Sequence, residues 1–516
     1  MATPSVYQQA IFKWIKSGRG NAVVNAVAGS GKTWTLVEAC KLLRTDRALF
    51  CAFNKHIQEE LGRRLPKNVT VKTLHSIGYS ALAGKWGKLK LDNDKIRILA
   101  EKPAKSVLRK LEKAQLAMIR RGEDVDTPEL GQVVGWLKDL THFCRVSLTD
   151  HTDAKALEGM ADYYGIEVDP MAWADVAEAT KCLIEESNRI AREQRVIDFD
   201  DMVYLPVHLG FLPARYDWVC LDEAQDLSAA QRALAISCLA PGGRMLAVGD
   251  PRQSIQGFAG ADPESFSCLK EELEAVELPL SVCYRCPTSH LDLARQIVPQ
   301  IEAAPTAEVG VLDWMKIQDV LAGVQEGDLI LSRMTAPAVS LCIQLIAKKI
   351  PARVKGRDIG AALARDVEQI SDLPGFKMAE FEHFAMKWFA KKEQKLLKKK
   401  GEHEAQVQAL WDRFEGLMAC YEAYPCENAL GLAKAIQSLF DDDRRSVTLS
   451  TIHRAKGLEA DRVWVLGANK LPAKFRGMQD WEQYQEECIK YVALTRARRK
   501  MYLVEAPPKG KERTDV

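Results

Sequence analysis

The chain has 516 residues, a formal net charge of +2 from 72 Lys and Arg against 70 Asp and Glu, and 47% hydrophobic residues. This balance is typical of a folded globular protein and excludes an intrinsically disordered chain. A charge so close to zero also excludes nucleic-acid binding by bulk positive potential, although it permits a local basic groove. At roughly 100–200 residues per domain, the length predicts about three or four domains.

The sequence shows no sign of a membrane-bound or secreted protein. No apolar stretch approaches the ~18–20 residues that cross a bilayer, and the first residues lack the apolar core of a signal peptide. The 13 cysteines are scattered. Cys283 and Cys286 have CxxC spacing, but they lack the nearby second pair or histidines that a zinc site needs. We therefore expect a cytoplasmic protein without a membrane partner, with its thiols reduced.

Short apolar runs bounded by Gly, Asp, Ser or Pro predict buried strands. They are residues 22–27, 48–53, 218–221, 245–248, 329–331, 447–450, 462–466 and 501–504. Polar or helical sequence follows each run, and this alternation predicts a doubly wound parallel sheet. Because the set occurs twice, before and after about residue 280, we expect two α/β cores.

Two long stretches between these runs lack strand signals and predict helices. Residues 81–194 suggest several amphipathic helices with breaks near 122–128 and 165–170. Residues 366–444 contain a lysine-rich run, whose members are Lys387, Lys391, Lys392, Lys395, Lys398, Lys399 and Lys400. A charge run of this kind is usually a solvated helix face. The alternative is an arm that contacts phosphates, and the sequence leaves both interpretations open.

The segment AVAGSGKT follows the first predicted strand and precedes a helix-like segment, which is the context of a phosphate-binding loop. Gly29, Ser30 and Gly31 would let backbone N–H groups curl around an anion. Lys32 would reach the β- and γ-phosphates, and the Thr33 hydroxyl would hold Mg²⁺. The predicted cofactors are therefore ATP and Mg²⁺.

A second half of this site follows the strand at 218–221, which ends in two carboxylates. Asp222 is predicted to bind the metal through water, and Glu223 is predicted to be the general base that activates the attacking water. An acidic pair together with a phosphate loop favours a nucleoside-triphosphate hydrolase over a small-molecule kinase.

The segments DEAQD and AGSGKT together resemble the UvrD/PcrA/Rep-like superfamily-one (1A) DNA helicases, and further motifs of that family follow in order to about residue 504. The resemblance implies nucleotide contacts by Gln8 (preferred to Gln9), Gln253 as the phosphate sensor, Tyr284 on adenine, Glu459, and Arg285 and Arg496 as arginine fingers. It implies DNA contacts by Phe53, Asn54, Thr73, His75, Phe258 and His453. Residues 198–201 resemble the DFDD segment of the family, which is usually structural.

The resemblance also implies two RecA-like motor cores, each interrupted by a mainly helical insertion. Core 1A would comprise residues 1–80 and 195–280, with insertion 1B at 81–194. Core 2A would comprise 281–365 and 445–516, with a short insertion 2B at 366–444.

The function so implied is an ATP-dependent single-stranded DNA translocase or helicase of 3′-to-5′ polarity, which acts on single strands and on single/double-strand junctions. An alternative is an ATP-gated DNA-binding or remodelling protein that acts with a nuclease or replication factor and does not unwind processively alone. The segment after Gln253 favours this alternative, because Gln256 and Ala259 replace an aromatic residue and an arginine of the family pattern. RNA in place of DNA also stays open.

Overall fold

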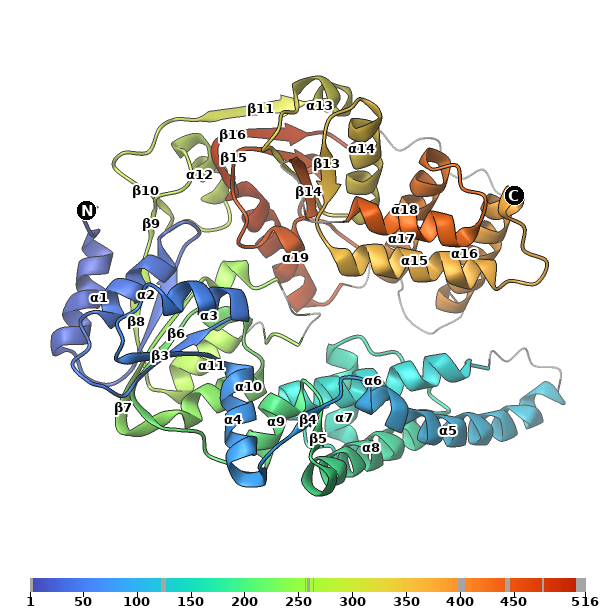
Figure 1. Ribbon diagram of the computed structural model, residues 1–516, viewed down its shortest axis with the longest axis horizontal. Coiled ribbons are helices and arrows are strands. Elements are labelled where there is room, and N and C mark those ends of the chain that lie inside the picture. The colour runs from blue at the N-terminus through green and yellow to red at the C-terminus, as the bar shows by residue number, and fades with distance from the viewer. Residues whose placement is uncertain are drawn as a thin grey trace. The chain divides into compact units, whose positions relative to one another are not determined.

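The computed structural model describes residues 3–121, 127–255, 257, 260–262, 264–397, 404–440, 446–475 and 478–506. The chain forms two compact units (Figure 1). Unit 1 comprises residues 1–26 and 31–280, and unit 2 comprises residues 27–30 and 281–516. Each unit is built on its own six-stranded sheet.

The sheet of unit 1 has the strand order β3-β2-β6-β7-β1-β8, and every neighbouring pair is parallel. Its strands are β1 (Ala22–Ala26), β2 (Ala48–Ala52), β3 (Val69–Thr73), β6 (Tyr216–Leu221), β7 (Leu239–Gly249) and β8 (Val276–Leu280). Successive residues of the central strands enter opposite hydrophobic cores. Val23 and Leu49 belong to one core, whereas Val24 and Phe50 belong to the other. This sheet is therefore buried on both faces, as parallel sheets usually are.

Two layers of helices cover these faces. One layer contains α1 (Val6–Ser17), α2 (Lys32–Cys40) and α3 (Lys55–Gly62). The other contains α4 (Leu74–Trp86), α9 (Asp201–His208), α10 (Ala229–Ser237) and α11 (Ser265–Glu272). Because strand and helix alternate along the chain, each connection crosses one face of the sheet and returns parallel.

The helices predicted between residues 81 and 194 form a bundle with its own hydrophobic core, in which α5, α6 and α8 run side by side (Figure 1). They are α5 (Lys95–Ile119), α6 (Leu130–Ser147), α7 (Ala154–Tyr163) and α8 (Trp173–Gln194). The short strands β4 (Lys90–Leu91) and β5 (Val196–Ile197) pair where the chain enters and leaves the bundle. The predicted break near 165–170 lies between α7 and α8.

Buried ion pairs join this bundle to α9 and the segment before it. Lys95 Nζ lies 2.6 Å from Asp201 Oδ2, and Arg145 Nη1 lies 2.9 Å from Asp198 Oδ2. Arg145 also donates to Ser187 Oγ at 2.7 Å. All five of these side chains are buried. Loss of one partner would leave an uncompensated buried charge, which costs about 3–5 kcal/mol.

The sheet of unit 2 is likewise parallel, in the order β11-β16-β15-β12-β14-β13. Its strands are β11 (Val311–Met315), β12 (Leu329–Ser332), β13 (Ala352–Val354), β14 (Val447–Thr451), β15 (Ala460–Leu466) and β16 (Ala497–Val504). A separate pair consists of β9 (Val282–Cys283) and β10 (Glu302–Ala303). Together the two sheets confirm the predicted pair of RecA-like α/β cores.

One hydrophobic cluster of unit 2 includes residues of the five strands β12 to β16, of α13 (Ile317–Gly323) and of five further helices. These five helices are α14 (Thr335–Ala347), α15 (Arg357–Ser371), α16 (Phe381–Leu397), α17 (Glu404–Ala423) and α18 (Ala429–Leu439). The remaining helices are α12 (Thr288–Ala294) and α19 (Asp480–Leu494). The predicted boundary between residues 365 and 366 falls inside α15, so the helices assigned to insertion 2B share their core with the helices around them.

All eight predicted strands are present, and each is a central strand of its sheet. The four edge strands β3, β8, β11 and β13 were not predicted from the apolar runs. Exposed residues interrupt three of them, such as Glu277 in β8 and Asp313 in β11. An edge strand has one free side and tolerates polar residues, and therefore does not read as a continuous apolar run.

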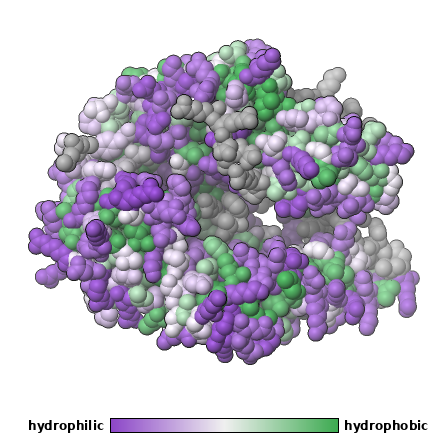
Figure 2. Space-filling model, viewed as in Figure 1, coloured by the Kyte–Doolittle hydropathy of each residue, from purple (hydrophilic) through white to green (hydrophobic). Residues whose placement is uncertain are grey.

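The surface follows the balanced composition. In the space-filling view hydrophilic residues cover most of the described surface, and hydrophobic residues occur in small groups (Figure 2). Among the residues that the structure describes, no helix is long and apolar enough to cross a membrane.

Gly78 tests the packing of α4 on α9. A Cβ atom there would lie 1.7 Å from the Met202 carbonyl oxygen, whereas a Cβ atom on Gly84 of the same helix would meet nothing within 4 Å. We predict that Gly78→Ala lowers stability by about 2 kcal/mol or more through overpacking. Gly84→Ala should raise stability by about 0.5–1 kcal/mol, because alanine favours a helix. Urea denaturation midpoints followed by circular dichroism would measure both, and equal midpoints would contradict this packing.

Candidate active site

The predicted phosphate loop forms the turn between β1 and α2. Gly29 and Gly31 have φ angles of +69° and +79°, a region that side chains other than glycine rarely adopt. A Cβ atom on Gly29 would lie 2.7 Å from Arg285 Cβ and 2.8 Å from Cys283 Sγ. The buried Ser30 Oγ has no hydrogen-bond partner among the described atoms. No side chain caps α2, whose N-terminus follows this loop, so the loop fits a phosphate ligand.

The two functional side chains at the start of α2 face the carboxylates that follow β6. Lys32 Nζ lies 2.7 Å from Glu223 Oε2, and Thr33 Oγ1 lies 3.0 Å from Asp222 Oδ2. Burial and the Glu223 carboxylate raise the pKa of Asp222 to about 6. Burial opposes the charge of Lys32, but the carboxylates of Glu223, Asp250 and Asp222 outweigh it and raise the pKa of the lysine. The structure thus brings together four of the predicted residues.

Thr33 and Asp222 are the residues that fit Mg²⁺. They offer two oxygen ligands side by side, and Mg²⁺ prefers oxygen ligands and usually keeps waters and phosphate oxygens in its shell. Within the described ranges no group of three or more His, Cys, Asp or Glu could hold a metal ion. Two protein oxygens leave coordination positions that the phosphate oxygens of a nucleotide can fill.

A buried glutamine that the sequence reasoning did not assign connects the carboxylates. Gln225 Nε2 donates to Glu223 Oε2 at 2.7 Å, and Gln225 Oε1 accepts from the Asp250 N–H at 2.9 Å. Asp250 in turn accepts a 2.7 Å hydrogen bond from Gln253 Nε2. Gln253, the predicted sensor, is therefore linked through two residues to Glu223. The DEAQD segment already pointed to Gln225, because this polar residue comes two positions after the acidic pair.

Glu223 is held in an unusual backbone conformation. Its φ angle is +54°, in the left-handed region, just before the turn Ala224–Asp226. Such strain in a residue other than glycine costs of order 1–3 kcal/mol and occurs often at functional sites. Here it turns the Glu223 carboxylate toward Lys32 and Gln225.

Gln8, predicted to read adenine, lies beside the phosphate loop. Its side chain is buried, its Nε2 donates to Thr35 Oγ1 at 3.1 Å, and it is 3.7 Å from the position that a Cβ atom on Gly31 would take. Gln9 is exposed and donates to the Pro4 carbonyl. The geometry therefore favours Gln8 over Gln9, and the adenine contact itself stays a prediction.

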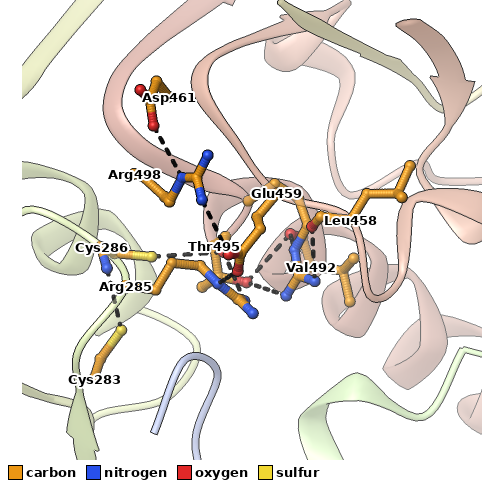
Figure 3. A network of polar contacts seen from close by, with 10 residues as sticks. Cys283, Arg285, Cys286, Leu458, Glu459, Asp461, Val492, Thr495 and Arg498 are labelled. Atoms are coloured by element: carbon orange, nitrogen blue, oxygen red, sulfur yellow. Dashed lines mark hydrogen bonds and ion pairs between the residues drawn. The ribbon is translucent and has the colours of Figure 1, made fainter. Parts of the chain in front are cut away.

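In unit 2 the predicted arginine Arg285 belongs to a polar network (Figure 3). Arg285 Nε donates to Glu459 Oε2 at 2.5 Å, and Arg285 Nη1 donates to the Thr495 carbonyl at 3.3 Å. The other Glu459 oxygen lies 3.4 Å from Arg498 Nη1, and Arg498 also pairs with Asp461. Glu459, predicted to contact the nucleotide, here orients two guanidinium groups.

The second predicted arginine finger, Arg496, is buried. Its guanidinium donates to the carbonyls of Val492 at 2.9 Å and Leu458 at 3.4 Å, and to Thr495 Oγ1 at 3.0 Å. The role of Arg496 in catalysis stays a prediction.

Residues 27–30 pack with the segment around Tyr284. The Tyr284 N–H donates to the Gly29 carbonyl at 2.9 Å, and the Ala28 N–H donates to Tyr491 Oη at 2.9 Å. The Tyr284 side chain itself is 47% exposed, which leaves its ring free to stack on a base. On either side of Tyr284 and Arg285, Cys283 and Cys286 are buried, and a hydrogen bond from Cys286 lowers the pKa of Cys283 to about 7.

The residues predicted to contact DNA in unit 1 follow β2 and β3. Phe53 is 40% exposed, and its ring and His75 line one pocket together with Asp222. Asn54 and Thr73 cap α3 and α4, since their side-chain oxygens accept from the N–H groups of Ile57 and Ser76. These two caps are structural functions that the motif comparison did not predict.

An exposed aromatic residue in the DFDD segment extends this surface. Phe199 is 52% exposed and stacks on His75 with ring centroids 4.0 Å apart and an interplanar angle of 24°. Burial lowers the pKa of His75, so its imidazole is neutral near pH 7. Asp198 and Asp201 of the same segment form the buried ion pairs, in agreement with a structural function for them.

The other predicted DNA contacts are Phe258, which lies outside the described residues, and His453 in unit 2. Burial and the charges of Arg333 and Arg454 lower the pKa of His453 to about 3. This imidazole is neutral at physiological pH, so a contact with a phosphate there would be a hydrogen bond rather than an ion pair.

The lysine-rich run lies only partly within the described residues. Lys392 Nζ lies 4.1 Å from the ring centroid of Trp388 and 3.0 Å from Gln369 Oε1. This lysine therefore packs against residues of α15 and α16. Lys391 is exposed. The side chain of Lys395 and residues 398–400 lie outside the described residues, and phosphate contact by this run stays a prediction.

A parallel sheet with a phosphate loop after β1 and an acidic pair after β6, with only β7 between these two strands, defines an α/β protein of the RecA-like nucleotide-binding class. Residues 7–274 match the UvrD/REP helicase N-terminal domain, and residues 284–506 match the UvrD-like helicase C-terminal domain. Because these matches span most of the chain, the protein belongs to the UvrD-like helicase family. The resemblance predicted from the motifs is confirmed.

Curated relatives include F-box DNA helicase protein 1 of Schizosaccharomyces pombe, 25% identical over 93% of this chain and 55% of that protein. ATP-dependent DNA helicase PcrA of Staphylococcus aureus is 22% identical over 55% of this chain and 38% of its own length. The chain thus spans about half or less of the relatives it matches. Among solved structures, an arterivirus nonstructural protein 10 (helicase) aligns with 10% identity and a TM-score of 0.34, covering 97% of this chain and 61% of that one.

Gln225 tests the connection between Glu223 and Asp250. We predict that Gln225→Leu lowers the rate of ATP hydrolysis by about 10- to 100-fold, because the catalytic carboxylate loses the donor that orients it. Affinity for a fluorescent ATP analogue should change little, since Lys32 and the phosphate loop are intact. Gln437→Leu, at an exposed position of α18, is the control. Steady-state hydrolysis rates check the prediction, and a Gln225→Leu rate equal to that of the control would contradict it.

Proposed function

We propose that this protein is an ATP-dependent, Mg²⁺-requiring translocase and helicase that moves along single-stranded DNA. One observation carries the proposal. Asp222, which lies beside Thr33 and next to Glu223, also lines the pocket that contains Phe53 and His75. A side chain that would sense the nucleotide and its metal is thus part of the wall of the candidate strand-binding surface.

The residues of unit 1 would share the chemistry of hydrolysis. Lys32 would bind the β- and γ-phosphates, and Thr33 and Asp222 would hold the metal that neutralises their charge. Glu223, freed from Lys32 by the bound phosphates, would accept a proton from the attacking water. Gln253 would sense the γ-phosphate. Its hydrogen bonds through Asp250 and Gln225 would link it to Glu223.

The candidate DNA surface suits a single strand of any sequence. Phe53 and Phe199 are exposed rings, and stacking on a base is worth about 1–3 kcal/mol with little preference among bases. Neutral His75 and the first turns of α3 and α4 offer hydrogen bonds to phosphates without a strongly basic surface. Such contacts agree with the near-zero net charge of the chain.

The proposal includes unwinding at single/double-strand junctions with 3′-to-5′ polarity, as the family resemblance implies. The relatives named DNA helicases support unwinding. Arg285 and Arg496 would complete the catalytic charge in the nucleotide-bound state, since an arginine finger is worth about 10³–10⁵ in rate. Closure and reopening with each ATP would then advance the strand.

The ion pair of Lys32 and Glu223 at the phosphate loop gives the direct test. We predict that Lys32→Ala and Glu223→Gln each reduce single-strand-stimulated ATP hydrolysis by at least about 10²-fold, through loss of phosphate binding and of the general base. Lys41→Ala is a matched control, because Lys41 is exposed at the end of α2 and pairs only with Glu38 among the described ion pairs. Coupled-enzyme assays with and without oligo(dT) would measure the rates. Full strand-stimulated ATP hydrolysis in either variant would contradict the proposed function.

Partial duplexes with 3′ or 5′ tails test unwinding separately from hydrolysis. Displacement of the 3′-tailed substrate with ATP, and not with a non-hydrolysable analogue, would support the proposed polarity. Hydrolysis stimulated by single strands without displacement of either substrate would instead favour the ATP-gated remodelling protein. Matched RNA oligonucleotides in the hydrolysis assay would identify the preferred nucleic acid.

A further inference from the structure

A histidine of the helical bundle lies between two functional segments of unit 1. His142, on α6, has its Nδ1 atom 2.7 Å from Asp200 Oδ2. On its other side, His142 Nε2 lies 3.6 Å from the position that a Cβ atom on Gly260 would take, and Val146 Cγ2 lies 2.7 Å from the same position. The His142 side chain therefore contacts Asp200 on one side and lies beside Gly260 on the other.

The first of these segments carries Phe199, one ring of the stacked pair, whereas His75 belongs to α4. Asp200 directly follows Phe199, whose exposed ring stacks on His75. Asp200 also precedes the first residue of α9, and its charge favours protonation of His75. The position and charge of one carboxylate thus affect both the Phe199 ring and the His75 ring.

The second segment continues from the predicted phosphate sensor. Seven residues after Gln253, Gly260 has a φ angle of +81° and closes a turn through its N–H to the Gly257 carbonyl. The N–H of Asp262 donates to the Leu227 carbonyl, so the end of this segment is attached to the chain that follows Asp222 and Glu223. A glycine is required where the turn approaches Val146, because any side chain would collide with it.

We propose that His142 is a positioning residue for single-stranded DNA binding, which holds the Phe199–His75 pair in place through Asp200 while it packs beside the turn that follows the phosphate sensor. This inference rests on the proposed function. It assigns to the helical bundle a direct part in shaping the strand-binding surface, although no residue of α6 carries a helicase motif.

The charge state of His142 sets the strength of this contact. Burial opposes protonation of His142, but its hydrogen bond to Asp200 and the charges of Asp200 and Asp139 outweigh both burial and Arg145, and raise its pKa above 6.5. Burial and the charge of Asp262, two residues after Gly260, raise the pKa values of Tyr163 and Tyr164. The ion pair with Asp200 is therefore present at low pH and is lost as the pH rises through the raised pKa of His142.

Three variants separate the proposal from a purely structural role. His142→Leu removes the hydrogen bond, and His142→Gln keeps a donor that does not titrate. His208→Gln replaces an exposed histidine at the other end of α9 and is the matched control. Two measurements apply to each: the anisotropy of labelled oligo(dT) without nucleotide, and the oligo(dT) concentration that half-stimulates ATP hydrolysis, both from pH 6 to 9.

We expect His142→Leu to weaken oligo(dT) binding by about 5- to 10-fold at pH 7, which is less than the full cost of a lost hydrogen bond to a charged group because His142 acts on the strand only through Asp200. The basal hydrolysis rate should stay within twofold. His142→Gln should recover most of the affinity but lose the part of the pH dependence that the wild type and His208→Gln share. Thermal unfolding would show whether the leucine variant is folded, and the pH profile of the glutamine variant decides the matter if it is not.

Unchanged affinity in His142→Leu, or an unchanged pH profile in His142→Gln, would overturn the role of His142. Failure of the proposed function would look different: wild-type hydrolysis would show no stimulation by oligo(dT), and the wild type would not bind the labelled strand. A positive wild-type result combined with unaltered His142 variants would therefore reject this inference alone.

Discussion

The parallel pairing of the strands in unit 1 is the constraint on which the site depends. In a parallel sheet all strands end at the same edge, and neighbouring strands place their next residues side by side. The phosphate loop follows β1, Asp250 follows β7, Asp222 follows β6, and Phe53 follows β2. The strand order therefore places nucleotide residues and strand-binding residues along one edge. The proposed coupling between ATP and DNA depends on this adjacency.

Buried charges fix the segment that carries Phe199. Arg145 contributes its guanidinium to Asp198, and Lys95 contributes its ammonium to Asp201, on either side of Phe199 and Asp200. A buried pair is a poor source of net stability, because desolvation offsets most of its attraction. Its geometric requirements are strict, however, so the segment has few alternative conformations. The helical bundle thereby helps to define a surface that otherwise consists of loops.

The local sequence predicted strands best where both faces of the strand are buried. Central strands such as β1 and β6 are buried on both faces, so their apolar runs predicted them directly. Edge strands such as β8 mix Glu277 with Leu280 and gave no comparable signal. The phosphate loop, Asp222 and Glu223 were predictable for a related reason, because phosphate binding requires fixed residue types at fixed spacing. Phe199 and His142 were not assigned functions, because their contacts depend on partners far away in the chain.

The sequence by itself determined the class of fold and the family and predicted the nucleotide site, since each depends on short-range patterns that survive without knowledge of the packing. Tertiary structure decided how these parts are connected. It showed that Asn54 and Thr73 cap helices, that His453 is half-buried and neutral, and that Phe199 stacks on His75. Burial, pKa and ring stacking depend on distances between residues that are remote in sequence. Only the folded chain sets those distances.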